Sequence, residues 1–153
     1  MVDIVNAVTR SRMMSGIRGR DTRPERQVRS LLHRQGFRFR LHSKVMPGRP
    51  DLVLPKYRVA IFVHGCFWHG HDCALFKWPA TRRAFWRAKI LANRKRDRVV
   101  GEQILAAGFR HLTVWECAFR GASSASATAS MRRTRAWLKA LKPAIGIVQR
   151  TRA

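Results

Sequence analysis

The segment from residue 64 to residue 73, HGCFWHGHDC, concentrates side chains that can do chemistry. Within ten positions it holds three histidines, two cysteines, one acid and two large aromatic residues. Thiolate and imidazole groups are common zinc ligands, whereas adjacent aromatic rings are typical of a core strand or a stacking surface. The segment therefore predicts a metal site and leaves open what its aromatic side chains contact.

A third cysteine completes the candidate metal site. The four expected ligands are Cys66, His71, Cys73 and Cys117. A Cys3His set is a common composition for structural zinc, which here would fasten the loop to the far end of a sheet. The alternative is three unrelated buried thiols, because free cysteine is often buried. All three cysteines lie next to predicted strand ends rather than within strands, which favours zinc.

An acid and two histidines remain outside this set. Asp51 opens a predicted strand at 51–54, and His64 directly follows a second one at 59–63, so the two could meet at one edge of a sheet. Together with His69 they would form a hydrolytic corner. Each has an ordinary alternative: Asp51 as a turn acid, and each histidine as a structural residue.

The elements expected to position these residues follow the order helix, three strands, helix, strand. Thr22, Pro24 and Glu25 mark the first helix start as N-cap, first-turn proline and capping-box acid, and Gly36 ends it. The remaining predicted elements are strands at 37–41, 51–54 and 59–63, helical stretches at 81–91 (capped by Thr81) and 93–107, and a last core strand at 109–115. This order predicts an α/β domain with a mixed sheet flanked by helices.

Two flanking regions complete the chain. The first twenty residues are polar and basic and could form a short helix or an arm that orders on DNA. Residues 122–130 are rich in alanine and serine, which predicts a flexible connection, and 131–141 can form a basic terminal helix. We expect a core domain at 1–121 with the arm at about 1–20, and residues 122–153 packing on or extending it.

The charge of the chain indicates a polyanionic partner. Lysine and arginine number 32 against 8 acids, a formal net charge of +24. Nucleic acid is the first candidate, ahead of a merely solvated basic surface or an acidic membrane. The 46% hydrophobic share argues against global disorder. No apolar run could span a bilayer and no signal-peptide pattern is present, so we expect a cytoplasmic protein whose cysteines bind metal rather than form disulfides.

The order of elements, with Pro50-Asp51 at the second strand, is the layout of the PD-(D/E)xK nuclease core. The second acid and the lysine of that motif are missing, because the third strand ends in Phe62-Val63-His64. A standard member is excluded, and this fold would require a variant catalytic site.

Several motifs together are more specific than this layout. They are TRSRMM at 9–14, RDTRPE at 20–25, PGRPD at 47–51, HGCFWHGHDC at 64–73, PATR at 79–82, FW at 85–86, Asn93, RD at 96–97 and VWEC at 114–117. From about residue 8 to 121 the chain closely resembles the very short patch repair (Vsr) DNA mismatch endonucleases. The loop motif is highly specific, whereas the tail after residue 121 carries no match.

The resemblance implies a variant PD-(D/E)xK fold with a structural Zn2+ and a catalytic Mg2+. The implied activity is nicking of one DNA strand 5′ to the thymine of a T:G mispair left by deamination of 5-methylcytosine. Double-stranded DNA with such a mispair is the expected partner of a monomeric enzyme. MutL-type repair proteins and a cytosine-5 methyltransferase are further candidate partners.

The resemblance also assigns roles residue by residue. Asp51 and the main-chain carbonyl of Val63 would bind Mg2+, His69 would be the general base, and His64 would stabilise the site. Familiar members have threonine in place of Val63, so the backbone ligand survives here and any help from the hydroxyl is lost.

Two further acids would contact metal-bound waters. Glu25 also has a capping role, and Asp97 lies in a run of basic residues where a surface ion pair is the alternative. Gly70 and Asp72 fill positions that are histidine in some relatives, which implies that they are not zinc ligands.

The aromatic residues would read the DNA. In the family, the residues matching Phe67, Trp68 and Trp86 wedge into the base stack beside the mispair, and those matching Met14 and Ile17 press from the minor groove. Apolar wedges unstack a base step at a cost of a few kcal/mol, and at less cost where the pair is already weak.

Two other functions remain open. A non-catalytic zinc-stapled DNA-binding module would explain the charge, the zinc set and the aromatic residues, but not why Asp51, His64 and His69 converge. A nuclease of the same fold with a different target, such as a restriction-type enzyme, would explain all of them.

Overall fold

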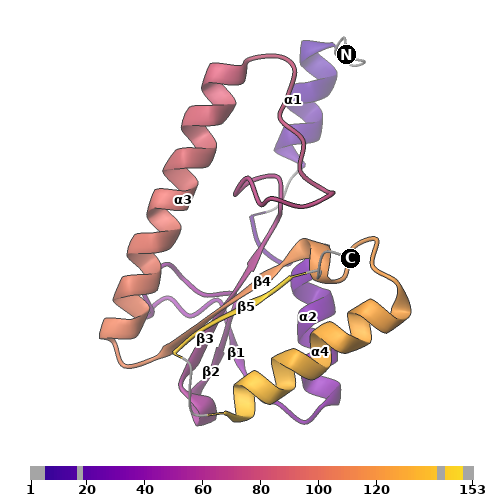
Figure 1. Ribbon diagram of the computed structural model, residues 1–153. Coiled ribbons are helices and arrows are strands. Elements are labelled where there is room, and N and C mark those ends of the chain that lie inside the picture. Colours follow the sequence, from indigo (N-terminus) through magenta and orange to yellow (C-terminus); the bar gives the residue numbers. More distant parts are fainter. Residues whose placement is uncertain (1–5, 17–18, 141–143, 150–153) are drawn as a thin grey trace.

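The computed structural model describes residues 6–16, 19–140 and 144–149 as an α/β fold (Figure 1). Its helices are α1 (Ala7–Ser15), α2 (Arg23–Arg34), α3 (Arg83–Ala106) and α4 (Ser124–Lys139), with single 3-10 turns at Pro55–Tyr57 and Glu116–Ala118. Its strands are β1 (Arg40–Leu41), β2 (Leu52–Leu54), β3 (Val59–His64), β4 (Arg110–Trp115) and β5 (Ile145–Val148). Among the described residues, no helix is long and apolar enough to cross a membrane.

The five strands form one mixed sheet in the order β1-β2-β3-β4-β5. β1, β2 and β3 pair antiparallel, whereas β4 pairs parallel to both β3 and β5. Parallel neighbours need a crossover, and α3 and α4 supply the two that are required. The helix, three strands, helix, strand order is confirmed, and a further helix and strand follow it.

Helices cover both faces of the sheet, with α2 and α4 on one side and α3 on the other (Figure 1). Alternation along β3 divides its side chains: Val59 and Ile61 pack in the cluster with α2 and α4, whereas Ala60 and Phe62 pack against Ile104 of α3. The loop that carries the candidate metal ligands begins at the carboxyl end of β3.

The predicted start of α2 is confirmed. Thr22 is the N-cap and its hydroxyl accepts a bond from the backbone N–H of Glu25 at 3.5 Å, with a proline in the first turn. Gly36 follows the helix at φ +87°, a conformation that glycine adopts without strain.

The central helix differs from its prediction. The stretches at 81–91 and 93–107 form one continuous helix, α3, and its N-cap is Arg82, at φ +50° and without a side-chain cap, rather than Thr81. Asn93 does not interrupt the helix, because its side chain donates to the carbonyl of Trp68 at 2.8 Å. Tertiary contact outweighs the low helix propensity of asparagine.

The first strand was predicted too long. Of residues 37–41 only Arg40 and Leu41 pair with β2, both of them exposed. Phe37 is instead buried in the core, where its ring meets Tyr57 edge-on at 5.3 Å.

The C-terminal prediction is wrong in two places. Residues 122–130 are not a flexible connection: Ser123 caps α4 by accepting from the backbone N–H of Ser126 at 3.2 Å, and alanine then favours the helix. The strand at 109–115 is also not the last of the sheet, because β5 pairs with β4.

Candidate active site and metal centre

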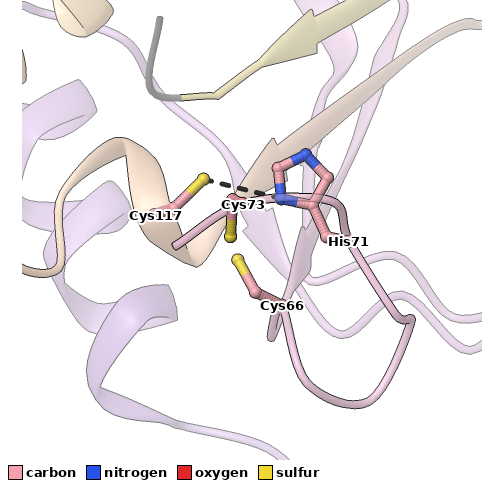
Figure 2. A group of neighbouring side chains, drawn as sticks. All are labelled: Cys66, His71, Cys73 and Cys117. Atoms are coloured by element: carbon pink, nitrogen blue, oxygen red, sulfur yellow. Dashed lines mark hydrogen bonds between the residues drawn. The ribbon is translucent and has the colours of Figure 1, made fainter. Parts of the chain in front are cut away.

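The four predicted metal ligands gather at one end of the sheet (Figure 2). Cys66 follows β3, His71 and Cys73 lie in the next loop, and Cys117 lies in the turn after β4. One ligand atom from each residue lies within 4.8 Å of the others. β3 and β4 are parallel and adjacent, which explains why cysteines about 50 residues apart meet. The cluster could bind a metal ion.

Two contacts orient His71 for such a role. Its Nε2 lies 2.7 Å from the side-chain oxygen Oε1 of Gln149, and its ring stacks on Trp115 with centroids 4.1 Å apart. Because the amide oxygen accepts, Nε2 carries the proton, and the unprotonated Nδ1 faces Cys117 Sγ at 3.6 Å. A hydrogen bond of this kind fixes the tautomer of a metal-binding histidine.

The protonation of the cysteine thiols depends on whether a metal ion is bound. Burial raises the pKa of the Cys66 thiol; a hydrogen bond from the Cys117 backbone opposes this rise, and the thiols of Cys117 and Cys73 add to it. A soft divalent ion would favour the thiolate forms instead, and thiolate with imidazole is a donor set typical of zinc.

A cleft beside this cluster holds most of the remaining predicted residues. It has a volume of about 560 Å³, and its lining includes Glu25, Asp51, Val63, Phe67, Trp68 and His69. Three basic residues, Lys89, Arg96 and Arg120, line the same cleft. The structure thus brings three acids (Glu25, Asp51 and Glu116), a histidine and aromatic rings together with basic residues.

Asp51 is a partly buried acid that lines the cleft. Its Oδ2 accepts a hydrogen bond from the backbone N–H of Val63 at 2.7 Å, across the antiparallel pair β2–β3. Burial raises the pKa of Asp51 to about 6, against the opposing effect of that hydrogen bond. A nearby Glu25 carboxylate adds to the rise. A divalent cation at this position would favour the ionised carboxylate.

Two histidines and an acid form a stacked group next to Asp51. The rings of His64 and His69 are parallel, with centroids 3.9 Å apart and planes within 3°. His69 Nδ1 is hydrogen bonded to Asp97 Oδ2. Burial, with the charge of His69, lowers the pKa of His64 to about 3, so His64 is neutral near pH 7.

Asp97 orients His69 rather than sitting in a surface ion pair. Burial, the largest single effect, would raise the pKa of Asp97, but the hydrogen bond from His69 and the charges of His64, His69 and Arg96 together lower it. An ionised carboxylate on Nδ1 directs the proton there and leaves Nε2 of His69 able to accept one.

The start of the loop is held to α3 by two side chains: Asn93, one of the family motif residues, and Arg94, which carries no signal in the sequence. Asn93 donates to the carbonyl of Trp68, and Arg94 donates from Nε to the carbonyl of His69 at 2.8 Å and from Nη2 to that of Gly70. Buried carbonyls need such donors. Arg94 could have been found only by knowing that α3 is continuous.

The predicted aromatic residues form a cluster at the rim. Phe67 lies 5.3 Å from Trp68 and 5.0 Å from Trp86, measured between ring centroids, and Trp68 and Trp86 are 6.0 Å apart. All three are only partly buried. Met14 lies on α1, a helix with no buried residue, and is 43% exposed. Ile17 lies outside the described residues.

Comparison with known proteins gives consistent matches. The model of one protein family, described as DNA mismatch endonuclease Vsr, matches residues 2–75. The DNA mismatch endonuclease Vsr of Escherichia coli (strain K12) is 46% identical over 138 residues, which cover 90% of this chain and 88% of that protein. The Type II nicking enzyme V.XorIIP of Xanthomonas oryzae pv. oryzae is 48% identical over 117 residues, 76% of this chain and 86% of its own. V.NmeAIP of Neisseria meningitidis, a Type II nicking enzyme, is 42% identical over 117 residues, 76% and 84% of the two chains.

Proposed function

The chain belongs to the Vsr family of DNA mismatch endonucleases, and from that premise we propose that it nicks one DNA strand 5′ to the thymine of a T:G mispair. As a member of this family the chain is a DNA mismatch endonuclease. We further propose that it prefers T:G mispairs and uses a catalytic Mg2+, with its site residues in the roles described below.

The observation that carries the proposal is that Asp51, His69, Phe67 and Trp68 line one cleft. A protein that only bound DNA through its charge would not need a partly buried acid beside an oriented histidine. Phosphodiester hydrolysis needs both, because water must lose a proton and charge on the phosphate must be neutralised.

The donor set at Asp51 suits a hard cation. The Asp51 carboxylate and the Val63 carbonyl would hold Mg2+, with Glu25 accepting from its bound water. When bound, Mg2+ would neutralise charge on the phosphate. This arrangement, on β2 and β3 with α2 and α3 beside them, supports a variant PD-(D/E)xK core.

The chain's own groups would then move the proton. His69, with Nδ1 held by Asp97, would take a proton from the attacking water at Nε2. His64, neutral and stacked on His69, would keep the imidazole in its plane. Lys89, Arg96 and Arg120 would hold the phosphate backbone in the cleft.

A nicking assay on a panel of duplexes tests the proposal. With Mg2+ present, we expect one nick 5′ to thymine in T:G duplexes, with or without flanking methylation, and little cleavage of matched duplexes.

Cleavage of both strands of a matched duplex would favour a restriction-type enzyme. Tight binding without cleavage in any divalent metal would favour the non-catalytic module.

Zinc is the ion we propose for the Cys3His cluster. Replacing Cys117 with serine should lower zinc content from about one ion per chain and lower the thermal unfolding temperature, because metal binding to such sites is coupled to folding. Elemental analysis with thermal denaturation, with and without a chelator, measures both effects. Natively purified, well-folded wild-type protein without zinc would contradict the assignment.

Trp68 is the proposed mismatch sensor. Base–aromatic stacking contributes about 1–3 kcal/mol per base, and it is recovered most fully where a pair is already weak. Trp68→Ala should therefore reduce the affinity ratio of T:G over matched DNA by roughly tenfold. Competition binding measures the ratio, and the salt dependence should stay unchanged because no phosphate contact is lost.

A second tryptophan provides the control for this test. Trp78 is 48% exposed and lies outside the cluster of Phe67, Trp68 and Trp86, so Trp78→Ala should leave the ratio unchanged. If Trp68→Ala is as stable as wild type and keeps the full ratio, Trp68 is not the sensor. If it weakens binding to all DNA and melts earlier, Trp68 is a core residue.

Further parts of the proposal concern where the protein acts, its partners and its domain boundaries. We propose a monomer acting in the cytoplasm at the nucleoid, with a cytosine-5 methyltransferase creating the sites that deaminate and MutL-type proteins acting nearby. We also propose residues 1–121 as the catalytic domain, with an N-terminal arm at about 1–20 contacting DNA through Met14 and Ile17, and residues 122–153 extending the domain.

A further inference from the structure

A charged network lies beside the cleft and includes one proposed site residue, Glu25. At its centre is Arg29 of α2, whose side chain is only 13% exposed. Its Nη1 lies 2.5 Å from Asp21 Oδ1, and its Nη2 lies 3.0 Å from Glu25 Oε2 and 3.0 Å from His42 Nε2. The network therefore joins α2 to the turn before it and to the loop after β1.

The network fixes the orientation of Glu25. Oε1 of this buried carboxylate accepts from the Thr22 hydroxyl at 2.8 Å, and Oε2 accepts from the backbone N–H of Asp21 at 2.9 Å as well as from Arg29. A carboxylate offers about four lone-pair positions. With three in use, little capacity is left besides one further donor, such as a water in the adjoining cleft.

Two strained residues belong to the same network. Asp21 has φ +56° and His42 has φ +45°, in the left-handed region that non-glycine residues seldom adopt. Such conformations persist where surrounding contacts over-determine them, and they concentrate at functional sites. Both of these residues contact the same guanidinium.

Arg29 supplies positive charge to a group of side chains that could otherwise hold a metal ion. Ligand atoms of Asp21, Glu25 and His42 lie within 4.8 Å of one another, and the guanidinium is the cation among them. Burial raises the pKa of Asp51, and the positive charge of Arg29 opposes that rise, so its field reaches the proposed Mg2+ ligand.

We propose that Arg29 is a positioning residue that holds Glu25 toward the cleft and sets how strongly the cleft attracts a divalent cation. The inference rests on the proposed function, in which Asp51 and Glu25 face Mg2+. Arg29 has two separable effects: its planar fork orients Glu25, and its charge competes with the bound cation. Lysine keeps the charge without the fork, whereas methionine removes both.

The two substitutions should therefore give different results. Arg29→Lys should lower the turnover of T:G nicking about tenfold, as loss of an outer hydrogen-bond partner does, with the half-saturating Mg2+ concentration within about twofold of wild type. Arg29→Met should lower turnover similarly, yet reduce the half-saturating Mg2+ concentration by roughly threefold or more, because a repelling charge is gone.

The test combines nicking against Mg2+ concentration with calorimetric titration of Mg2+ into the DNA-free protein at pH 8. Arg34→Met is the matched control, because Arg34 is on the same helix, is exposed and bonds only to Ser30 among the contacts seen. It should behave as wild type. Thermal unfolding of each variant identifies general loss of structure.

Two outcomes overturn the inference. Wild-type turnover in a stable Arg29→Lys or Arg29→Met variant removes the positioning role. An unchanged or weaker calorimetric Mg2+ affinity in stable Arg29→Met removes the charge role. If methionine prevents folding, lysine decides, since it must still lower turnover. Failure of the proposed function looks different: wild type would then nick without Mg2+, or Asp51→Ala would remain active.

Discussion

Asp51→Ala is expected to reduce nicking of a T:G duplex by about 10³-fold or more, while binding to the same duplex stays close to wild type. The proposed metal ligand is lost, and with it the stabilisation of charge that develops on the phosphate, a term of several kcal/mol. Binding depends instead on phosphate contacts and aromatic stacking, which the substitution does not touch. Single-turnover nicking and equilibrium binding, both measured on the same T:G duplex, distinguish a loss of catalysis from a loss of DNA binding.

An acid elsewhere on the protein provides the control. Glu102 is exposed on α3 and lines none of the cavities described above, so Glu102→Ala should nick normally. Near-normal turnover of Asp51→Ala in Mg2+ would remove the catalytic reading of the cleft. Equal loss of binding and nicking would show that Asp51 supports the structure instead.

Asp51→Asn tests the same residue through folding stability, which should rise, whereas nicking should fall. Folding raises the pKa of Asp51 from 3.8 to about 6, so folding favours the protonated acid. The protonated acid therefore contributes at most ~3 kcal/mol to the free energy of unfolding. This contribution is fully present below pH 3.8 and is lost as pH rises through about 6. At pH 8 without metal, the neutral amide should therefore raise the free energy of unfolding by about 1–3 kcal/mol. Mg2+ should stabilise the wild type but not this variant.

Local signals were enough to predict α2 and the strands at the site. Thr22 and Glu25 bond to each other within one helical turn, and Gly36 needs only its own backbone freedom. β2 and β3 are short apolar runs bounded by turns. Features of this kind depend on neighbours a few residues away, which a single sequence displays.

The elements that were missed depend on distant contacts. The sequence predicts a break in the helix near Asn93, but Asn93 instead bonds to Trp68, 25 residues away. The segment at 122–130 looked like a linker because its residues are small, yet small residues let α4 lie close to the sheet, with Ser130 and Thr134 fully buried. β5 is four residues long and, among the described strands, pairs with β4 alone.

Among the site residues, too, those with local sequence signals could be predicted and those defined by distant contacts could not. Residues with distinctive chemistry, such as Cys117 and Asp51, could be identified from type and spacing. Residues that orient them could not: Gln149 meets His71 across 78 positions, and Arg29 meets His42 across 13. Arginine and glutamine are common on surfaces, so only the folded chain distinguishes those that hold a site together.

His69→Ala is expected to lower nicking by 10²–10⁴-fold, the range typical for loss of a general base. The stacking of His69 on His64 and its bond to Asp97 hold Nε2 in one direction, so no neighbour can replace it. The substitution also leaves Asp51 in place, and Mg2+ binding by calorimetry should therefore remain near wild type. That distinguishes loss of the base from loss of the metal.

The role of His69 as a base has a chemical signature that a structural role lacks. Added imidazole should restore part of the activity of His69→Ala, increasingly as pH rises and the free base accumulates. Asp97→Asn should lower turnover less than His69→Ala and should not respond to imidazole, because the ring is present but its proton is no longer directed to Nδ1. His33→Ala, at an exposed histidine of α2, should be neutral in both assays. If stable His69→Ala nicks at the wild-type rate, the attacking water is activated without this imidazole and the base must be sought among the metal-bound waters near Asp51.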